Sequence, residues 1–148
     1  MPEITSRILS CPGAEVKCER TAWVKMAQSL HIVNQTRPLA RSIQAGVCDS
    51  FITRLRGYMF TSTIQSYEGL WFVQTRASRA DTSIHMFFMS FDVAVIWVDR
   101  DYRVVDTRLA KRWRPYYAPV RPALYFLETH PDRLADFHSG DQLSLQPC

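Results

Sequence analysis

The sequence predicts a mainly β fold, namely a compact antiparallel β-sandwich or barrel of seven to eight short strands with two short helices. Two observations favour this class. Most apolar runs are about four to eight residues long and end at turn-forming residues, which is typical of strands. The chain has 148 residues, 47% of them hydrophobic and 22% charged. A chain of this size buries about 70% of its unfolded surface as one domain.

Residues 1–28 show no sustained hydrophobic period, and Cys11-Pro12-Gly13 has the composition of a turn. We expect a poorly structured N-terminal leader there, with one short helix around Thr21–Gln28. Residues 29–148 are expected to form a single β-rich domain. The sequence contains no export signal and no run of about 18 apolar residues. Its four cysteines lack zinc-ligand spacing, so we expect a reduced, cytoplasmic protein.

The first half of the predicted domain holds three strands and a helix. Asp49 offers a side-chain oxygen for a helix N-cap. Phe51, Leu55 and Met59 then recur every four residues, which predicts a helix that ends near Phe60. The strands are expected at His31–Gln35, Ser42–Val47 and Leu70–Val73.

The second half is richer in strands. Val93–Val98 is apolar at every position, which indicates a strand covered on both faces. The polar Asp99–Tyr102 then fits a hairpin turn. Pro131 suits the start of a second short helix, and Gly140 fits its end. The strands are expected at Ser83–Phe88, Val93–Val98, Arg103–Thr107, Ala123–Glu128 and Gln142–Leu145.

His85 is the most unusual residue of the predicted strands, because it stands within an apolar run. Alternation would place His85, Phe87 and Met89 on one face of the sheet. We expect His85 to be a core histidine with one hydrogen-bond partner, since no further metal ligand is placed by spacing. No metal or cofactor is therefore expected, and a metal-binding module built on His85, Met86 and Met89 is a third alternative.

Glu128 ends an apolar strand and shares its parity with Phe126, so its side chain is expected to point inward. A buried carboxylate needs a cation or several donors, and Arg54 or Arg56 beside the first helix is the available kind of partner. Such a pair would stabilise the fold. The enzymatic alternative is a hydrolase or lyase in which His85 acts with Glu128 or Asp92.

A basic aromatic loop is the most asymmetric feature of the sequence. Between Arg103 and Arg121 six cations face one acid, so this stretch carries +5 against +4 for the whole chain. Its centre interleaves cations with aromatic rings, a composition that can stack on flat groups while neutralising an anion. We call Lys111–Tyr117 the basic loop; its candidate binding residues are Lys111, Arg112, Trp113, Arg114 and Tyr117.

These observations predict a non-enzymatic binding or accessory domain that recognises a partner or an anionic ligand through the basic loop. The alternative for the loop is a solvated segment whose Trp113 and Tyr117 pack back on the sheet edge. A net charge of +4 is modest for a nucleic-acid binder, and the phosphate-binding glycine motifs are absent. Nucleic acid is therefore not the expected ligand.

Seven segments in a fixed order carry a resemblance to a known family. They are Arg54-Leu55-Arg56-Gly57-Tyr58-Met59, Gly69-Leu70-Trp71-Phe72, Ile84-His85-Met86-Phe87-Phe88-Met89, the Val93–Asp99 strand, Arg112-Trp113-Arg114-Pro115, Leu127-Glu128 and Gly140-Asp141. Over about residues 40–146 the chain resembles the conserved prokaryotic domain of unknown function 192. The resemblance implies a compact, mainly antiparallel β domain with short helices, and it implies no settled activity.

The resemblance also marks recurrent positions. The chain departs from the family at Tyr58, where the family often has leucine, and at Ala94, where the family often has an aspartate. We expect structural roles at several recurrent positions, with Gly57 and Gly140 serving close packing or a positive φ. The positions are Arg54, Gly57, Met59, His85, Met89, Asp99, Glu128, Gly140 and Asp141.

Overall fold

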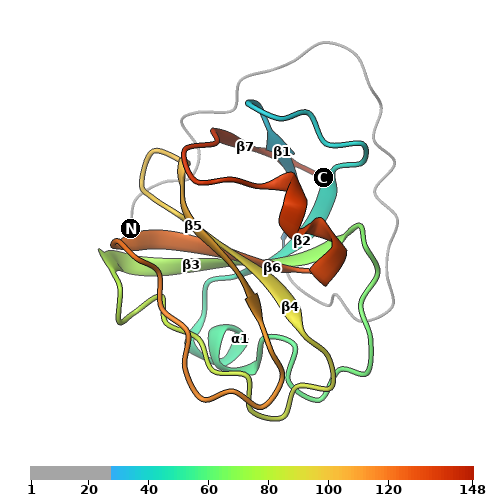
Figure 1. Cartoon of the computed structure of the whole chain (residues 1–148), viewed down its shortest axis with the longest axis vertical. Helices are drawn as coiled ribbons and strands as arrows, with labels where there is room; N and C mark the ends of the chain where they lie inside the picture. Colours follow the sequence, from blue (N-terminus) through green and yellow to red (C-terminus); the bar gives the residue numbers. More distant parts are fainter. Residues whose placement is uncertain (1–27) are drawn as a thin grey trace.

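A computed structural model describes residues 28–148 and confirms a mainly β fold with two short helices (Figure 1). The expected leader, with its helix at Thr21–Gln28, lies outside the described residues apart from Gln28. The helices are α1 (Phe51–Arg56) and the 3-10 helix η2 (Pro131–Asp136). The strands are β1 (Ser29–Asn34), β2 (Ile43–Cys48), β3 (Glu68–Ser78), β4 (Val93–Val98), β5 (Val104–Ala110), β6 (Ala123–Thr129) and β7 (Leu143–Pro147).

The seven strands form one curled sheet, a half-barrel with the order β5-β4-β6-β3-β2-β1-β7. Neighbouring strands are antiparallel except β2 and β3, which run parallel and are connected through α1, so the sheet is mixed. The two sheet edges meet at one end. There the Val104 N–H donates to the Asp141 carbonyl, and the Leu143 N–H donates to the Tyr102 carbonyl, both at 2.8 Å.

Each face of the sheet carries its own hydrophobic core, and β4 is buried along its whole length, as predicted. One core is built on Ile32, Trp71, Ile96 and Leu127 and includes Phe137 just after η2. The other lies beneath α1 and the loops that follow β3 and β5. Its members include Cys48, Tyr58, Leu70, Phe72, Ile84, Met86, Met89, Val95, Trp97 and Phe126.

Helix α1 is shorter than the prediction. Its N-cap is Ser50 instead of Asp49, and the Ser50 hydroxyl accepts from the Thr53 N–H at 3.2 Å. The helix stops at Arg56 because Gly57 adopts a φ of +44°, which a helix cannot continue. Phe51 and Leu55, whose spacing predicted the helix, are exposed.

The prediction of a strand at Ser83–Phe88 is wrong. The segment is a loop that covers one face of the sheet, and it forms only an isolated bridge between Ile84 and Tyr117. It leaves the extended conformation at Phe88, whose φ is +59°, and the Phe88 carbonyl accepts from the Phe60 N–H. Among residues 28–148, neither helix is long and apolar enough to cross a membrane.

Candidate functional site

A cavity of about 310 Å³ lies between α1, residues 57–59, the loop at residues 83–89 and the face of β3 and β6. In Figure 1, α1 lies at the foot of the molecule beside the loops that follow β3 and β5, while β1 and β7 lie at the opposite end. The cavity wall is mainly apolar. Its polar side chains are Arg54, Arg56, Tyr58, Gln74, Asp81, Ser83, His85 and Glu128.

Glu128 is the buried ionisable group of this cavity. It stands on β6, opposite Leu70 of β3 and Val95 of β4, and only 7% of it is exposed. Burial raises the pKa of the Glu128 carboxyl to about 8, because the charged form loses its hydration. The inward orientation was predicted correctly from the alternation along the strand.

The predicted ion pair of Glu128 with Arg54 or Arg56 is wrong. Among residues 28–148, no side chain forms an ion pair or a hydrogen bond with the Glu128 carboxyl. Arg54 Nη1 donates instead to the Asp49 and Val73 carbonyls, each at 3.1 Å. These backbone acceptors lie closer to the Arg54 guanidinium than the Glu128 carboxyl does. Arg54 therefore links the start of α1 to β3.

His85 was expected in the core, and the structure places it at the exposed edge of the cavity. Its Nδ1 accepts from the Phe87 N–H at 3.3 Å. The structure thus brings His85 and Glu128 to one cavity. Asp92 is absent from the cavity wall, and its Oδ1 accepts from the Arg112 N–H at 2.9 Å.

The other proposed metal ligands belong to the core. Met86 and Met89 are both buried in this core, whereas His85 is exposed. Met59 packs against the same core and also lines the cavity. In the described part of the chain, no three side chains of His, Cys, Asp or Glu are grouped so that they could hold a metal ion.

Some cations of the basic loop are bonded to other residues, and others have no bonding partner within residues 28–148. Arg112 is held by an ion pair with Asp92 and by a 3.1 Å hydrogen bond from Nη1 to the Ser90 carbonyl. The Tyr117 hydroxyl accepts from the Lys111 N–H at 3.0 Å, which closes the loop. Within residues 28–148 the side chains of Lys111 and Arg114 form no ion pair or hydrogen bond.

An exposed aromatic stack joins the basic loop to the segment after α1. Phe60 stacks on Phe88 with ring centroids 5.3 Å apart, and Trp113 meets Phe88 edge-on at 5.6 Å. The three residues are 74%, 50% and 57% exposed. Each has a positive φ, at 61°, 59° and 65°.

Phe60 and Phe88 were not predicted to be surface residues. Predicted secondary structure placed Phe60 at the end of a helix and Phe88 in a strand. The adjacent rings Phe87-Phe88 were the available signal, because two successive aromatic residues cannot both face one core in a strand. Trp113 is exposed and does not pack on the sheet edge, whereas Tyr117 is half-buried and packs on the core.

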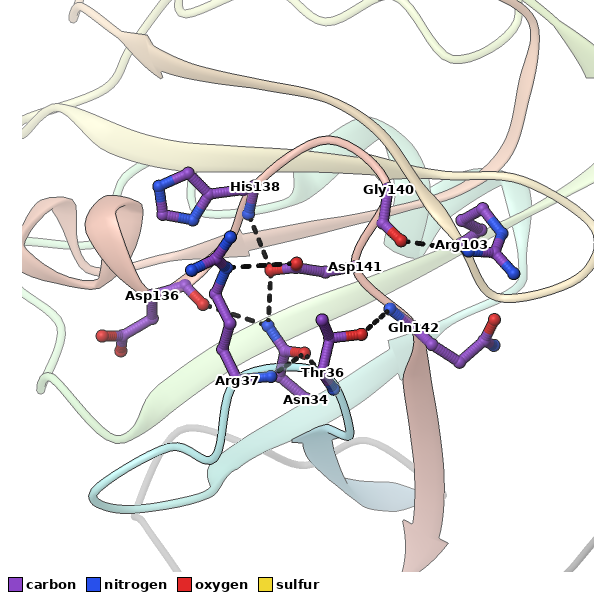
Figure 2. A network of polar contacts seen from close by, with 9 residues as sticks. All are labelled: Asn34, Thr36, Arg37, Arg103, Asp136, His138, Gly140, Asp141 and Gln142. Atoms are coloured by element: carbon purple, nitrogen blue, oxygen red, sulfur yellow. Dashed lines mark hydrogen bonds and ion pairs between the residues drawn. The ribbon is translucent and has the colours of Figure 1, made fainter.

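The recurrent residues Gly140 and Asp141 lie at the other end of the molecule, where the sheet edges meet (Figure 2). Asp141 accepts from the Asn34 amide and the His138 N–H, both at 2.9 Å, and from Arg37 Nε at 3.2 Å. Burial alone would raise the pKa of Asp141, but these hydrogen bonds and the Arg37 charge outweigh it and lower the pKa.

Two recurrent residues shape turns near this network. Gly140 has a φ of +95°, and its carbonyl accepts from Arg103 Nη1 at 3.1 Å. Asp99 Oδ1 accepts from the Asp101 and Arg103 N–H groups, each at 2.9 Å, which fixes the hairpin between β4 and β5. The recurrence of both residues is therefore explained by their roles in turn geometry.

Comparisons with known proteins agree on one group. The family model of DUF192, described as an uncharacterised group, matches residues 32–145. A UPF0127 protein of Thermococcus kodakarensis is 38% identical over 118 residues, which cover 78% of this chain and 73% of the relative. A UPF0127 protein of Thermococcus gammatolerans is 39% identical over 115 residues, which cover 76% and 73%.

Two solved structures share the fold. A protein of unknown function from Novosphingobium aromaticivorans has a TM-score of 0.67 at 17% identity, covering 86% of this chain and 99% of that one. A Sinorhizobium meliloti protein, named as a candidate transcription regulator, has a TM-score of 0.68 at 14% identity, covering 80% and 92%. At these identities the likeness concerns the fold alone.

Proposed function

This chain belongs to the uncharacterised DUF192 family, and we propose that it is a non-enzymatic binding domain that recognises an anionic ligand through the basic loop and the aromatic stack. The observation that carries this proposal is the stack itself. Phe60, Phe88 and Trp113 adopt left-handed backbone conformations while their rings stay largely in solvent.

Backbone strain gives this observation its weight. A left-handed conformation costs about 1–2 kcal/mol for each residue other than glycine. Burial of the three rings does not offset that cost, since each ring is at least half exposed. Strained residues of this kind cluster at binding and catalytic sites, where the conformation serves function. Three of them joined through the Phe88 ring therefore support a recognition surface.

Charge beside the stack favours an anion. Lys111 and Arg114 flank Trp113 in the sequence, and neither side chain has a partner among the described residues. The acid near the loop, Asp92, is already paired with Arg112 at 3.4 Å. A flat anionic group could stack on an exposed ring while the two free cations neutralise its charge.

The hydrolase or lyase alternative lacks an assembled acid–base pair among the described residues. With a pKa of about 8, the Glu128 carboxyl is mostly protonated at neutral pH. The Nδ1 atom of His85 accepts from the Phe87 N–H, so the neutral ring carries its proton on Nε2. Within residues 28–148, Glu128 and His85 are not hydrogen-bonded to each other, and Asp92 lies outside the cavity. The candidate residues therefore do not form the hydrogen-bonded acid and base that this alternative requires.

Anisotropy titrations of the full chain with labelled polyphosphate, an acidic glycan and an oligonucleotide test the proposal. The double variant K111A/R114A should bind the preferred probe about tenfold more weakly at low salt, because two phosphate-type contacts are lost. F88A/W113A should weaken binding without altering its salt dependence. R100A, which removes an exposed arginine on the turn between β4 and β5, is the matched control. Equal binding by K111A/R114A and R100A, or no binding of any probe, would reject the proposal.

A further inference from the structure

We infer that the cavity beside α1 is a second binding site, which takes a small uncharged ligand with an apolar body and a carboxamide-like head that exchanges two hydrogen bonds with Glu128. This inference goes beyond the basic loop and concerns different residues. It stands on the unpartnered carboxyl, the open space above it and the apolar wall.

The Glu128 carboxyl is a hydrogen-bonding group left for a ligand. The residue is more than nine-tenths buried, yet its side chain has no hydrogen bond or ion pair within residues 28–148. The carboxyl lines the cavity and is accessible from it, so a molecule held there could supply the partners that the described residues do not.

Gly57 keeps the space above this carboxyl open. A Cβ atom at position 57 would lie 3.5 Å from Glu128 Oε2 and 3.4 Å from the Phe72 ring. The φ of +44° at Gly57 also disfavours every other residue there. The backbone conformation therefore requires glycine beside the Glu128 head group, where an added Cβ atom alone would make only ordinary van der Waals contacts.

The remaining wall suits the apolar body of a small molecule. Leu55, Met59, Phe72 and Met89 line the cavity together with Ile84. A volume of about 310 Å³ lies at the lower end of the range of small-molecule sites. A dry cavity of about 150 Å³ already accommodates benzene, so a single ring with a polar head would fit.

Charge around the cavity disfavours an ionised ligand. A cation would require Glu128 to ionise and would pass Arg54 and Arg56, which line the cavity. Asp81 does not offset them, since it is paired with Arg76. An anion would find no free cation next to Glu128, because the Arg54 guanidinium is bonded to the Asp49 and Val73 carbonyls and Glu128 forms no ion pair within residues 28–148.

A carboxamide matches the neutral carboxyl. With a pKa of about 8, Glu128 offers both an O–H donor and a carbonyl acceptor at pH 6.5. The other titratable groups that face it are Arg54, Arg56, Tyr58, Asp81 and His85 from the cavity wall, Cys48 of β2 and, next to Tyr58, Glu68 of β3.

Three probes with the same ring separate the possibilities: benzamide is neutral, benzamidinium is a cation and benzoate is an anion. Each is titrated into the ¹⁵N-labelled full chain at pH 6.5 and followed by NMR. We expect benzamide to shift the Gly57 and Glu128 amide signals and to bind at least tenfold more tightly than the two ions. Preferential binding of either ion, or no benzamide binding, would overturn the inference.

Substitutions at Glu128 complete the test. E128L should abolish benzamide binding, whereas E128Q should keep it within about threefold because an amide also donates and accepts. Benzamide affinity should fall above pH 8 in the natural chain and stay constant in E128Q. K111A/R114A should bind benzamide normally, so failure at the basic loop and failure at the cavity are distinguishable. Benzamide binding by E128L equal to that of the natural chain would overturn the inference.

Discussion

Replacing Glu128 by glutamine should stabilise the protein, and the gain should grow with pH. The substitution keeps the shape of the side chain and removes its titration. In the folded chain the pKa of Glu128 is about 8, against an ordinary value of 4.5. Between these values the folded state binds more protons than the unfolded state. The natural chain therefore loses stability as the pH rises through this window, and E128Q does not.

The size of the effect follows from the two pKa values. A difference of one pKa unit corresponds to about 1.4 kcal/mol. Integrating both titrations, the natural chain loses about 2.5 kcal/mol relative to E128Q between pH 5 and pH 7. The difference should level off above pH 8, where the carboxyl is ionised in both states.

Urea denaturation at pH 5, 6, 7, 8 and 9, followed by the fluorescence of the buried Trp71 and Trp97, measures this difference. With an m-value of about 2 kcal/mol per molar urea, the midpoint of E128Q should gain about 1 M on the natural chain from pH 5 to pH 7. All other titrating groups are common to both proteins. A stability difference that stays constant from pH 5 to pH 8 would refute the reasoning, because it would mean that burial does not disfavour the charged form.

Three further substitutions test other parts of the structure by urea denaturation. D141N should cost about 1–3 kcal/mol at pH 7; because the folded-state pKa of Asp141 is lowered, the deficit should shrink as the pH falls toward and below that pKa, and a deficit that grows as the pH falls from 7 would contradict this. G69A should destabilise by more than about 2 kcal/mol, because its Cβ would lie 3.0 Å from the Glu128 carbonyl oxygen as well as 2.9 Å from Leu127 Cδ1; a neutral G69A would show that β3 and its neighbours can shift to accept the added atom. R54M should lose about 1–2 kcal/mol with the bonds to the Asp49 and Val73 carbonyls, and an unchanged midpoint would exclude an anchoring role for Arg54.

Sequence reasoning succeeded where one local pattern determines the structure. The continuous apolar run of β4 and the polar turn after it could be predicted from neighbouring residues. A strand buried on both faces is apolar at successive positions, and a hairpin turn favours particular polar residues. The inward orientation of Glu128 followed from strand parity in the same way. These features involve few residues close together in the chain.

Features that depend on contacts between residues far apart in the sequence could not be predicted. The segment around His85 does alternate, with Ile84 and Met86 buried and His85 and Phe87 exposed. Periodicity cannot tell a sheet strand from an extended loop that covers the sheet. The partner of Arg54 was also out of reach, since the Val73 carbonyl comes near it only after α1 packs on β3.

The order of the strands has a consequence for how the chain folds. β1 lies between β2 and β7, and Asn34 and Asp141 are 107 residues apart in sequence although their side chains are hydrogen-bonded. Such long-range pairing slows folding, because loop closure must precede the contacts that reward it. During synthesis, the β1 edge and its Asn34 amide must wait until β7 has left the ribosome. We therefore expect this edge to be the last part of the sheet to form and the part most exposed to premature association with other chains.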